Sequence, residues 1–214
     1  MRYIVVLFLF SVLAGYGQDP LRFASEIEDI QKKYDSLWDS SKETIVFTGS
    51  SSIRIWSDLE KRFPEHHIVN SGFGGSQASD LLAHSEALIL RYKPKKVFIY
   101  EGDNDIASEK KPKEIMATTQ EIIARIRGTN PTTKIVLIAA KPSIARWNLK
   151  RNYKKLNRKF RRMSQKDVLI DYADVWRPML EKRKVKQDIF LEDGLHMNSK
   201  GYDLWYEVIK NYVD

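Results

Sequence analysis

Cysteine is absent from the 214-residue chain, and histidine occurs only four times. Without cysteine the chain can form no disulfide and has no residue for a lipid-modified N-terminus. The folded protein must therefore be held together by its apolar core, and its length suits one domain with a sizeable core. Internal repeats, low-complexity tracts and linkers rich in proline, glycine or serine are also absent. We therefore expect a single domain over residues 18–214.

Long apolar runs are absent except for one short run at the N-terminus. Arg2 precedes this run at Ile4–Leu13, and mostly small residues follow at Ala14–Gly17. This order is typical of a secretory signal peptide, which we predict over residues 1–17 with cleavage before Gln18. The run is short for a membrane span, and the alternative is an uncleaved anchor. We expect an exported protein, periplasmic or secreted, with no stable membrane span after cleavage.

Acidic residues are outnumbered by basic ones, and the formal net charge is +8. Much of the excess lies in Lys150–Lys166, which contains nine basic residues and no acidic one. The apolar residues of this stretch fall on one face at helical spacing, which favours a solvated helix face. The functional alternative is attraction to an anionic glycan, a phospholipid head group or the bacterial surface. An exported protein seldom meets nucleic acid, so we expect no nucleic-acid partner.

Short β-rich apolar runs alternate with stretches of helical periodicity along the chain. We predict strands at Thr44–Thr48, His67–Asn70, Lys96–Tyr100, Lys134–Ala139 and Val168–Asp171. We predict helices over residues 22–37, 81–92, 115–126, 153–163 and 201–212. This alternation implies an α/β fold in which a five-stranded parallel sheet is covered by helices on both faces. Ligands bind beyond the carboxyl ends of the strands in such sheets, so the residues after each strand are candidates for a site.

Three consecutive serines follow the first predicted strand, in Gly49-Ser50-Ser51-Ser52. A glycine lets the chain turn sharply out of a sheet, and a serine placed there is exposed at the start of the next helix. Such a hydroxyl can attack a carbonyl with help from nearby backbone N–H groups. The competing interpretation is that the serines are helix N-caps.

The second predicted strand is followed by a glycine-rich loop. Gly72, Gly74 and Gly75 would let backbone N–H groups point at an anion. The pattern of a dinucleotide-binding loop fails, because Gln77 occupies the position of its last glycine. The alternative is a plain glycine turn with Ser76 as a helix cap.

The third predicted strand is followed by Glu101-Gly102-Asp103-Asn104-Asp105. The side-chain amide of asparagine can bind an oxyanion without changing charge. An Asx turn is the alternative for Asn104. The acidic residues around it could suggest a site for a hard cation, but EF-hand spacing is absent and we expect no metal.

An acid and a histidine lie three residues apart near the C-terminus, at Asp193 and His196. A histidine that transfers protons needs a neighbour to fix its tautomer and stabilise its charged form, and Asp193 can do so from this spacing. The pair lacks a nucleophile and an oxyanion site, which the loops at the strand ends could supply. We expect His66, His67 and His84 to take no part in the chemistry.

Together these loops supply serine, glycine, asparagine and Asp-x-x-His, in that order. The chain thus resembles the SGNH hydrolases, the GDSL-like lipase/acylhydrolase family, which is named for these four residues in four blocks. The resemblance extends from Thr44 to about Tyr212. Its most specific parts are Gly102-x-Asn104-Asp105 and Asp193-x-x-His196, followed by Asn70-x-Gly72-x-Gly74-Gly75.

The first block departs from the family pattern, which has Gly-Asp-Ser where this chain has Gly49-Ser50-Ser51. Counting from the glycine makes Ser51 the nucleophile and places Ser50 where the family has aspartate. Ser52 remains a competitor because the run is degenerate.

The resemblance implies the flavodoxin-like fold of these hydrolases and a serine mechanism. In that mechanism Ser51 attacks an ester carbonyl, His196 transfers the proton, and Asp193 holds the imidazole. The oxyanion hole would consist of the backbone N–H groups of Ser51 and Gly75 and the side-chain amide of Asn104. The resemblance implies no metal and no organic cofactor.

The small size and the Gly-Ser-Ser-Ser-Ile-Arg block are similar to the platelet-activating-factor acetylhydrolase-like branch of the family. That likeness implies removal of short acyl groups, acetyl above all, from sugars or lipids. We therefore expect an exported esterase that deacetylates carbohydrate. The alternatives are a lysophospholipase, a general short-chain esterase, and a non-catalytic glycan-binding relative.

Overall fold

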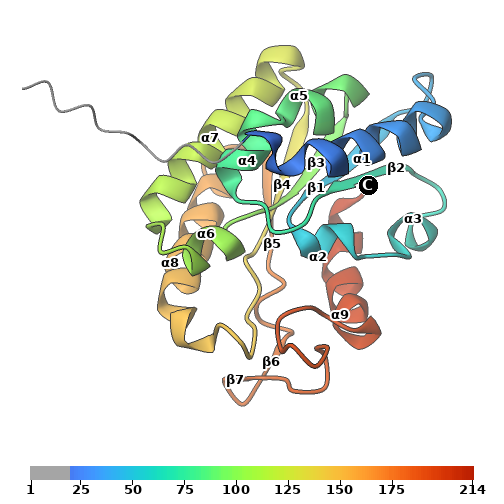
Figure 1. Cartoon of the computed structure of the whole chain (residues 1–214). Helices are drawn as coiled ribbons and strands as arrows, with labels where there is room; N and C mark the ends of the chain where they lie inside the picture. The colour runs from blue at the N-terminus through green and yellow to red at the C-terminus, as the bar shows by residue number, and fades with distance from the viewer. Residues whose placement is uncertain (1–19) are drawn as a thin grey trace, which may run out of the picture.

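The computed structural model describes residues 20–214, and the predicted signal peptide and its cleavage site lie outside this range. The main sheet consists of β1 (Thr44–Gly49), β2 (His67–Gly72), β3 (Lys96–Tyr100), β4 (Lys134–Ile138) and β5 (Ile170–Ala173). The strands are ordered β2-β1-β3-β4-β5, and every neighbouring pair is parallel (Figure 1). The predicted five-stranded parallel sheet is therefore confirmed.

Helices cover both faces of this sheet. The α-helices are α1 (Ala24–Leu37), α2 (Ser51–Arg54), α3 (Leu59–Arg62), α4 (Ala78–Ala83), α5 (Ser85–Leu88), α6 (Asp103–Ala107), α7 (Pro112–Thr129), α8 (Lys150–Ser164) and α9 (Ser199–Ile209). Short 3₁₀ helices are η1 (Pro20–Phe23), η2 (Leu90–Tyr92), η3 (Trp147–Leu149) and η4 (Lys210–Tyr212). A two-stranded hairpin, which the sequence patterns did not predict, pairs β6 (Leu180–Glu181) with β7 (Lys184–Val185).

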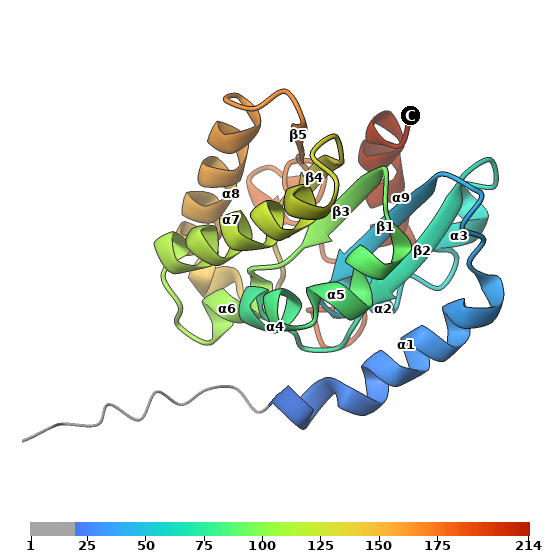
Figure 2. The same ribbon diagram turned by 90° about the horizontal axis from the view of Figure 1, so that it is seen from above.

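The layering follows from the strand order. The chain steps from β1 to β2 in one direction and then passes through β3, β4 and β5 in the other. Because parallel crossovers are right-handed, this reversal places the connecting helices on opposite faces. Helices α3 and α9 cover one face, and α4, α5, α7 and α8 cover the other, with α1 packed against α5 (Figure 2). The three-layer α/β/α arrangement is confirmed, and the reversal point lies between β1 and β3.

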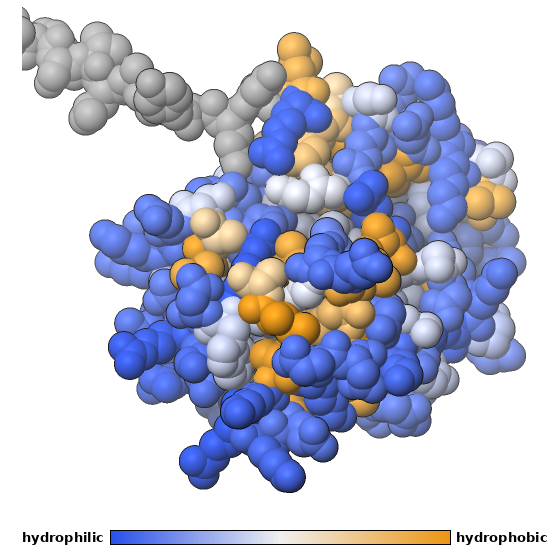
Figure 3. All heavy atoms as spheres, turned by 60° about the horizontal axis from the view of Figure 1, so that its bottom comes forward, coloured by the Kyte–Doolittle hydropathy of each residue, from blue (hydrophilic) through white to orange (hydrophobic). Residues whose placement is uncertain are grey.

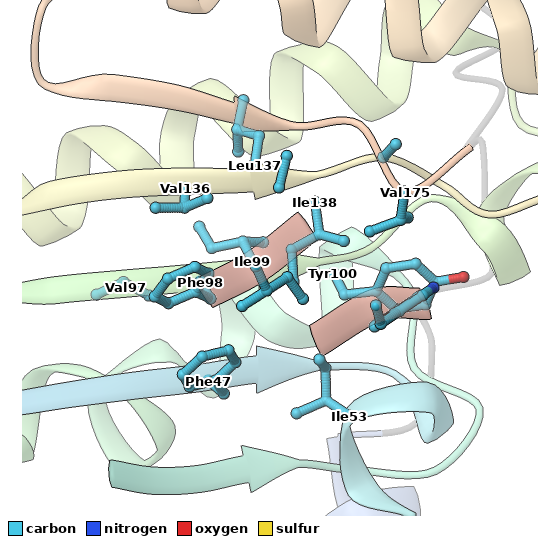
Figure 4. Packing of buried hydrophobic residues seen from close by; sticks show 14 of the residues in the cluster. Phe47, Ile53, Val97, Phe98, Ile99, Tyr100, Val136, Leu137, Ile138 and Val175 are labelled. Carbon is cyan, nitrogen blue, oxygen red and sulfur yellow. The ribbon is translucent and has the colours of Figure 1, made fainter. Parts of the chain in front are cut away.

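Stacked aromatic and aliphatic side chains fill the space between the layers. The rings of Phe47 on β1 and Phe98 on β3 stack with their centroids 4.1 Å apart, and both side chains are fully buried. Figure 4 shows these two rings beside aliphatic residues of β4 such as Val136 and Ile138. Burial of this continuous apolar surface holds the sheet and its helices together without disulfides.

The last strand begins two residues later than predicted. The predicted strand started at Val168, but this side chain is 97% exposed and lies in a turn. Asp167 causes the turn, because its Oδ1 accepts the backbone N–H of Leu169 at 3.0 Å and its carbonyl accepts that of Ile170. An Asx turn therefore takes up the first half of an apolar run that resembles a strand.

The helix predicted over residues 81–92 is divided into three short pieces, α4, α5 and η2. The break falls at His84, where the hydroxyl of Ser85 donates to the carbonyl of Leu82 at 2.9 Å. Serine side chains that bond to nearby backbone compete with helix continuation. Most of the predicted apolar face is nevertheless buried, at Leu81, Leu88, Ile89 and Tyr92, and Leu82 is partly buried. Among residues 20–214, no helix is long and apolar enough to cross a membrane.

Candidate active site

The first strand ends in a turn that only glycine can make. Gly49 has φ +122°, and a Cβ at this position would lie 2.0 Å from the carbonyl oxygen of Tyr100. The same carbonyl accepts the backbone N–H of Ser50 at 3.0 Å. This contact directs the chain into α2, so Ser51 occupies the first position of that helix, at the carboxyl end of β1.

The three serines have different surroundings. The hydroxyl of Ser51 lies 3.0 Å from Nε2 of His196. The hydroxyl of Ser50 instead accepts a hydrogen bond from the Asn104 amide at 2.7 Å. Ser52 is only 2% exposed. Among the residues described, Ser51 is therefore the serine that contacts the imidazole, which is the choice that counting from Gly49 predicts.

The acid and the histidine of the C-terminal loop are held together by several hydrogen bonds. Oδ2 of Asp193 lies 2.5 Å from Nδ1 of His196. Its Oδ1 accepts the backbone N–H groups of Leu195 at 2.8 Å and His196 at 2.9 Å. Partial burial by itself raises the pKa of this carboxyl, but the hydrogen bonds outweigh it and the pKa falls to about 2. The carboxylate is thus charged at neutral pH.

The two imidazole nitrogens of His196 face different partners. When Nδ1 carries the proton, it donates a hydrogen bond to Asp193, and Nε2 is left as an acceptor that faces the Ser51 hydroxyl. This arrangement can remove a proton from Ser51 and stabilise the imidazolium that results.

The aromatic packing of α9 places this loop opposite α2. Tyr202 donates its phenol to the carbonyl oxygen of Ser52 at 2.9 Å, and its ring stacks on Trp56. Trp205 packs edge-on against the same Trp56. Since α9 begins three residues after His196, these contacts fix the distance between the histidine and the serine turn.

The glycine loop after β2 is packed against α1 and α2. A Cβ on Gly72 would lie 2.4 Å from the backbone nitrogen of Arg54 on α2. The N–H of Gly74 donates to the carboxylate of Glu26 on α1 at 2.9 Å, so an acidic side chain occupies one of the predicted anion-binding donors. Gly75 has φ +70°, and only the end of Arg22 comes within 4 Å of a Cβ built there.

The side chain of Asn104 joins the loops that follow β1, β2 and β3. Its Nδ2 donates to the Ser50 hydroxyl at 2.7 Å and to the carbonyl oxygen of Ser76 at 2.9 Å. Gly102, with φ +104°, makes the turn that brings α6 and Asn104 into this position. The structure therefore brings Asn104, the carbonyl of Ser76 and the serine turn together.

The acidic residues around Asn104 bind the protein's own donors. Oε1 of Glu101 accepts the Ser76 hydroxyl at 2.7 Å, and Oδ2 of Asp105 accepts the backbone N–H of Ala78 at 3.1 Å. Burial raises the pKa of Glu101 well above its usual range and also raises that of Asp105. Within residues 20–214, no group of three or more His, Cys, Asp or Glu side chains is arranged to hold a metal ion.

A buried charged network beside Asn104 was not predicted from the sequence. The carboxylate of Asp103 lies 2.6 Å from Nη1 of Arg146 and 3.3 Å from Nζ of Lys141, and it accepts the phenols of Tyr100 and Tyr153. Lys141 and Arg146 follow β4, so inspection of the residues after the fourth predicted strand would have found them. Burial alone raises the pKa of Asp103, but Lys141 and Arg146 outweigh it and hold the pKa at about 2.

The segment after β4 also contacts the histidine loop. The backbone N–H groups of Ile144 and Ala145 donate to the carbonyl oxygen of Gly194 at 2.9 and 3.1 Å. Ile144 is 38% exposed, and Leu191, whose N–H donates to the carbonyl of His196, is 50% exposed. Figure 3 shows apolar residues near the middle of one face of the molecule, surrounded by hydrophilic ones. The candidate site therefore has apolar surface beside it.

The other three histidines have structural contacts. His66 lies 3.2 Å from the carboxylate of Asp214, His67 accepts the backbone N–H of Asp39, and His84 packs against the ring of Phe73. Each thus has a role in packing or hydrogen bonding that needs no chemistry.

Comparison with solved structures gives similar folds of bacterial proteins. A Streptococcus pneumoniae protein assigned as a platelet activating factor has TM-score 0.77 and 23% identity, covering 90% of this chain and 94% of its own. A GDSL-like lipase from Bacteroides thetaiotaomicron has TM-score 0.70 and 18% identity, covering 90% and 96%. An acetylxylan esterase from Geobacillus stearothermophilus has TM-score 0.65 and 16% identity, covering 79% and 93%. At these identities the comparisons establish the fold.

No curated protein sequence matches the chain. The model of one protein family does match, over residues 35–204, a range that includes β1, all the loops described above and the first half of α9. The chain therefore belongs to the GDSL-like lipase/acylhydrolase family, whose members are carboxylic ester hydrolases.

Proposed function

We propose that the protein is an exported serine esterase that removes short acyl groups, chiefly acetyl, from carbohydrate. The observation that carries the proposal is the relay from Ser51 through His196 to Asp193, with contacts of 3.0 and 2.5 Å. Membership of an acylhydrolase family supports the reaction class. The predicted signal peptide supports export.

Each step of the proposed reaction has a residue to perform it. Oγ of Ser51 forms a bond to the ester carbonyl carbon while Nε2 of His196 accepts the hydroxyl proton and Asp193 stabilises the imidazolium. The tetrahedral intermediate then breaks its bond to the alcohol oxygen, which takes the proton from Nε2. Water repeats the sequence on the acyl-enzyme, releasing the carboxylic acid and restoring Ser51.

The oxyanion would be met by the backbone N–H of Ser51, the N–H of Gly75 and the amide of Asn104. The Ser51 N–H lies in the first turn of α2, where helix geometry leaves it without an intrahelical acceptor. Both amide hydrogens of Asn104 are used in the resting site, by Ser50 and by the Ser76 carbonyl. The developing oxyanion must therefore replace the Ser50 hydroxyl as acceptor, and a full negative charge is the stronger one.

Acetylated carbohydrate is the favoured substrate because acylhydrolases of similar fold include an acetylxylan esterase. Ile144 and Leu191, exposed beside the histidine loop, favour a second candidate. A lysophospholipid could lay its acyl chain on these two apolar side chains. The two functions differ in the acyl length at which hydrolysis is fastest.

The test is a series of p-nitrophenyl esters from acetate to laurate, extended to acetylated xylan and lysophospholipid. We expect the acetate ester and acetylated xylan to be hydrolysed fastest. We expect hydrolysis of both to be lost in Ser51→Ala. Ser50→Ala and Ser52→Ala are matched controls that should retain the nucleophile. Equal rates in wild type and Ser51→Ala would exclude the esterase and support a glycan-binding relative. Preference for laurate and lysophospholipid would support the second candidate.

A further inference from the structure

The guanidinium of Arg146 contacts two consecutive side chains at the candidate site. Its Nη1 donates to Oδ1 of Asp103 at 2.6 Å and to Oδ1 of Asn104 at 3.1 Å. A guanidinium can only donate, so it selects the oxygen end of the Asn104 amide and leaves the nitrogen end facing Ser50 and Ser76. The orientation of the amide is therefore decided by Arg146.

Arg146 is itself held by a buried anion. Asp103 is 5% exposed, and Lys141, which is 1% exposed, contacts its other oxygen. The phenols of Tyr100 and Tyr153 complete the donors around this carboxylate. A guanidinium held against a buried, fully hydrogen-bonded carboxylate has little freedom to move, so the amide next to it is pre-organised.

Arg146 also ends the segment that contacts the histidine loop through Ile144 and Ala145. One short stretch of chain thus touches both the loop of His196 and the side chain of Asn104. It links the acid–base half of the site to the oxyanion half.

We propose that Arg146 is a positioning residue for the oxyanion hole: it fixes the Asn104 amide so that the N–H group now bonded to Ser50 faces the reacting carbonyl, and it polarises that amide so that it binds the oxyanion more strongly. This inference rests on the proposed esterase function. Arg146 does not touch substrate, and its whole effect passes through Asn104.

A double-mutant cycle tests this role on p-nitrophenyl acetate. We expect Arg146→Gln to lower kcat by about 10- to 100-fold with KM nearly unchanged, because the lost interaction strengthens in the transition state. Arg146→Lys should recover part of the loss. In an Asn104→Ala background, Arg146→Gln should cost almost nothing further. Arg127→Gln removes the partner of Asp167 on α7, outside both proposed sites, so it is the matched control and should leave kcat unchanged.

Equal losses from Arg146→Gln in the wild-type and Asn104→Ala backgrounds would overturn the proposal, as would a loss confined to KM. Thermal unfolding of each variant separates a folding defect from a catalytic one. If Ser51→Ala abolishes turnover while the cycle is additive, the positioning role fails and the esterase stands. If Ser51→Ala has no effect, the esterase itself fails.

A second observation concerns the basic stretch, which forms α8. Its exposed side chains include like-charged neighbours one turn apart, such as Arg151 with Lys155 and Arg158 with Arg162. Such pairs destabilise a helix, and none of these four residues forms an ion pair within residues 20–214. The fold does not need this charge, which favours a role in binding.

A hollow of about 400 Å³ lies between α8 and the loop that precedes α7. Basic residues line it from both sides, among them Lys111, Lys113, Lys155 and Arg158, whereas Glu109 is its single acidic residue. The aromatic residues of α8, Tyr153 and Phe160, are buried and cannot stack on bases. The surface therefore offers positive charge without groups that stack on nucleic acid or insert into a membrane.

We infer that this surface, defined by α8 and residues 109–113, binds an anionic polysaccharide that carries the ester. Helix α8 begins four residues after Arg146 and is about 22 Å long by helix geometry, enough for several sugar units. A chain bound along it would hold neighbouring ester groups near the serine turn. This inference also rests on the proposed function.

Binding of polygalacturonate to the full chain tests the surface. We expect Lys155→Glu with Arg158→Glu to weaken binding at least about tenfold, and rising salt to weaken it in the wild type. Lys42→Glu with Lys61→Glu changes the net charge equally at exposed positions outside the surface and is the matched control. Hydrolysis of p-nitrophenyl acetate should be unchanged in the control variant.

If the two charge reversals weaken binding of polygalacturonate equally, the proposed binding surface is wrong. Tighter binding of single-stranded DNA or of anionic vesicles would also contradict the proposal. Ser51→Ala should bind the polymer as the wild type does, so this binding measurement is independent of catalysis. Loss of ester hydrolysis with binding intact would count against the esterase alone.

Discussion

The hydroxyl oxygen of Ser51 lies 3.0 Å from Nε2 of His196, although the two residues are 145 positions apart in the chain. Two local features create this contact. The glycine turn after β1 presents the serine, and the Asx-type hydrogen bonds of Asp193 present the histidine. The packing of α9 against Trp56 then brings the two loops together.

Replacing Asp193 by asparagine should nearly abolish catalysis without unfolding the protein. An amide at this position would donate toward Nδ1, so the ring would carry its proton on Nε2 and could no longer accept one from Ser51. We expect kcat for p-nitrophenyl acetate to fall by about 1,000- to 10,000-fold. Glu192→Gln removes a neighbouring exposed acid and should leave kcat unchanged; similar losses in both variants would contradict the assigned role.

Gly49→Ala should prevent stable folding. The φ of +122° is strained for alanine, and its Cβ would overlap the carbonyl oxygen of Tyr100 at 2.0 Å. Gly128→Ala is the matched substitution, since nothing lies within 4 Å of a Cβ there and the residue is in α7. It should raise the free energy of unfolding by about 0.5–1 kcal/mol. Chemical denaturation of both variants measures the free energy of unfolding, which should fall in Gly49→Ala and rise in Gly128→Ala.

Tyr202→Phe should destabilise the protein through the loss of one hydrogen bond. The phenol donates to the buried carbonyl of Ser52, which would be left without this donor. We expect the free energy of unfolding to fall by about 1–3 kcal/mol. Tyr206→Phe, on the same helix but with no hydrogen bond to its hydroxyl among residues 20–214, should cost less. If the two variants unfold at the same denaturant concentration, the bond contributes nothing.

Glu101→Gln should make stability less dependent on pH. Burial, and then the nearby charge of Asp105, raise the pKa of Glu101 well above its usual range, so the folded state favours the protonated carboxyl. The stability that this carboxyl contributes is fully present below its unfolded pKa of about 4.3 and is lost as the pH rises through its raised folded pKa. The glutamine variant should therefore gain in Tm over the wild type between pH 5 and pH 8. Glu114→Gln, an exposed change on α7, should show no such trend.

The sequence by itself determined the fold class and the four loops. The short apolar runs correctly predicted β1 to β4, because strands of a parallel sheet that is covered on both faces are apolar along their whole length. The helical periodicity correctly predicted α1, α7, α8 and α9. The patterns failed at the start of β5 and within residues 81–92. There Asp167 and Ser85 hydrogen-bond to the backbone and end the regular structure, which hydrophobic periodicity does not register.

Only the tertiary structure decided which serine meets the histidine and what orients Asn104. Ser50, Ser51 and Ser52 are chemically identical, and they differ only in the direction each side chain takes from the start of α2. Arg146 reaches Asn104 from 42 residues away, through a network that burial around Asp103 creates. Local sequence encodes turns and periodicity, whereas contacts between distant loops depend on how the layers pack.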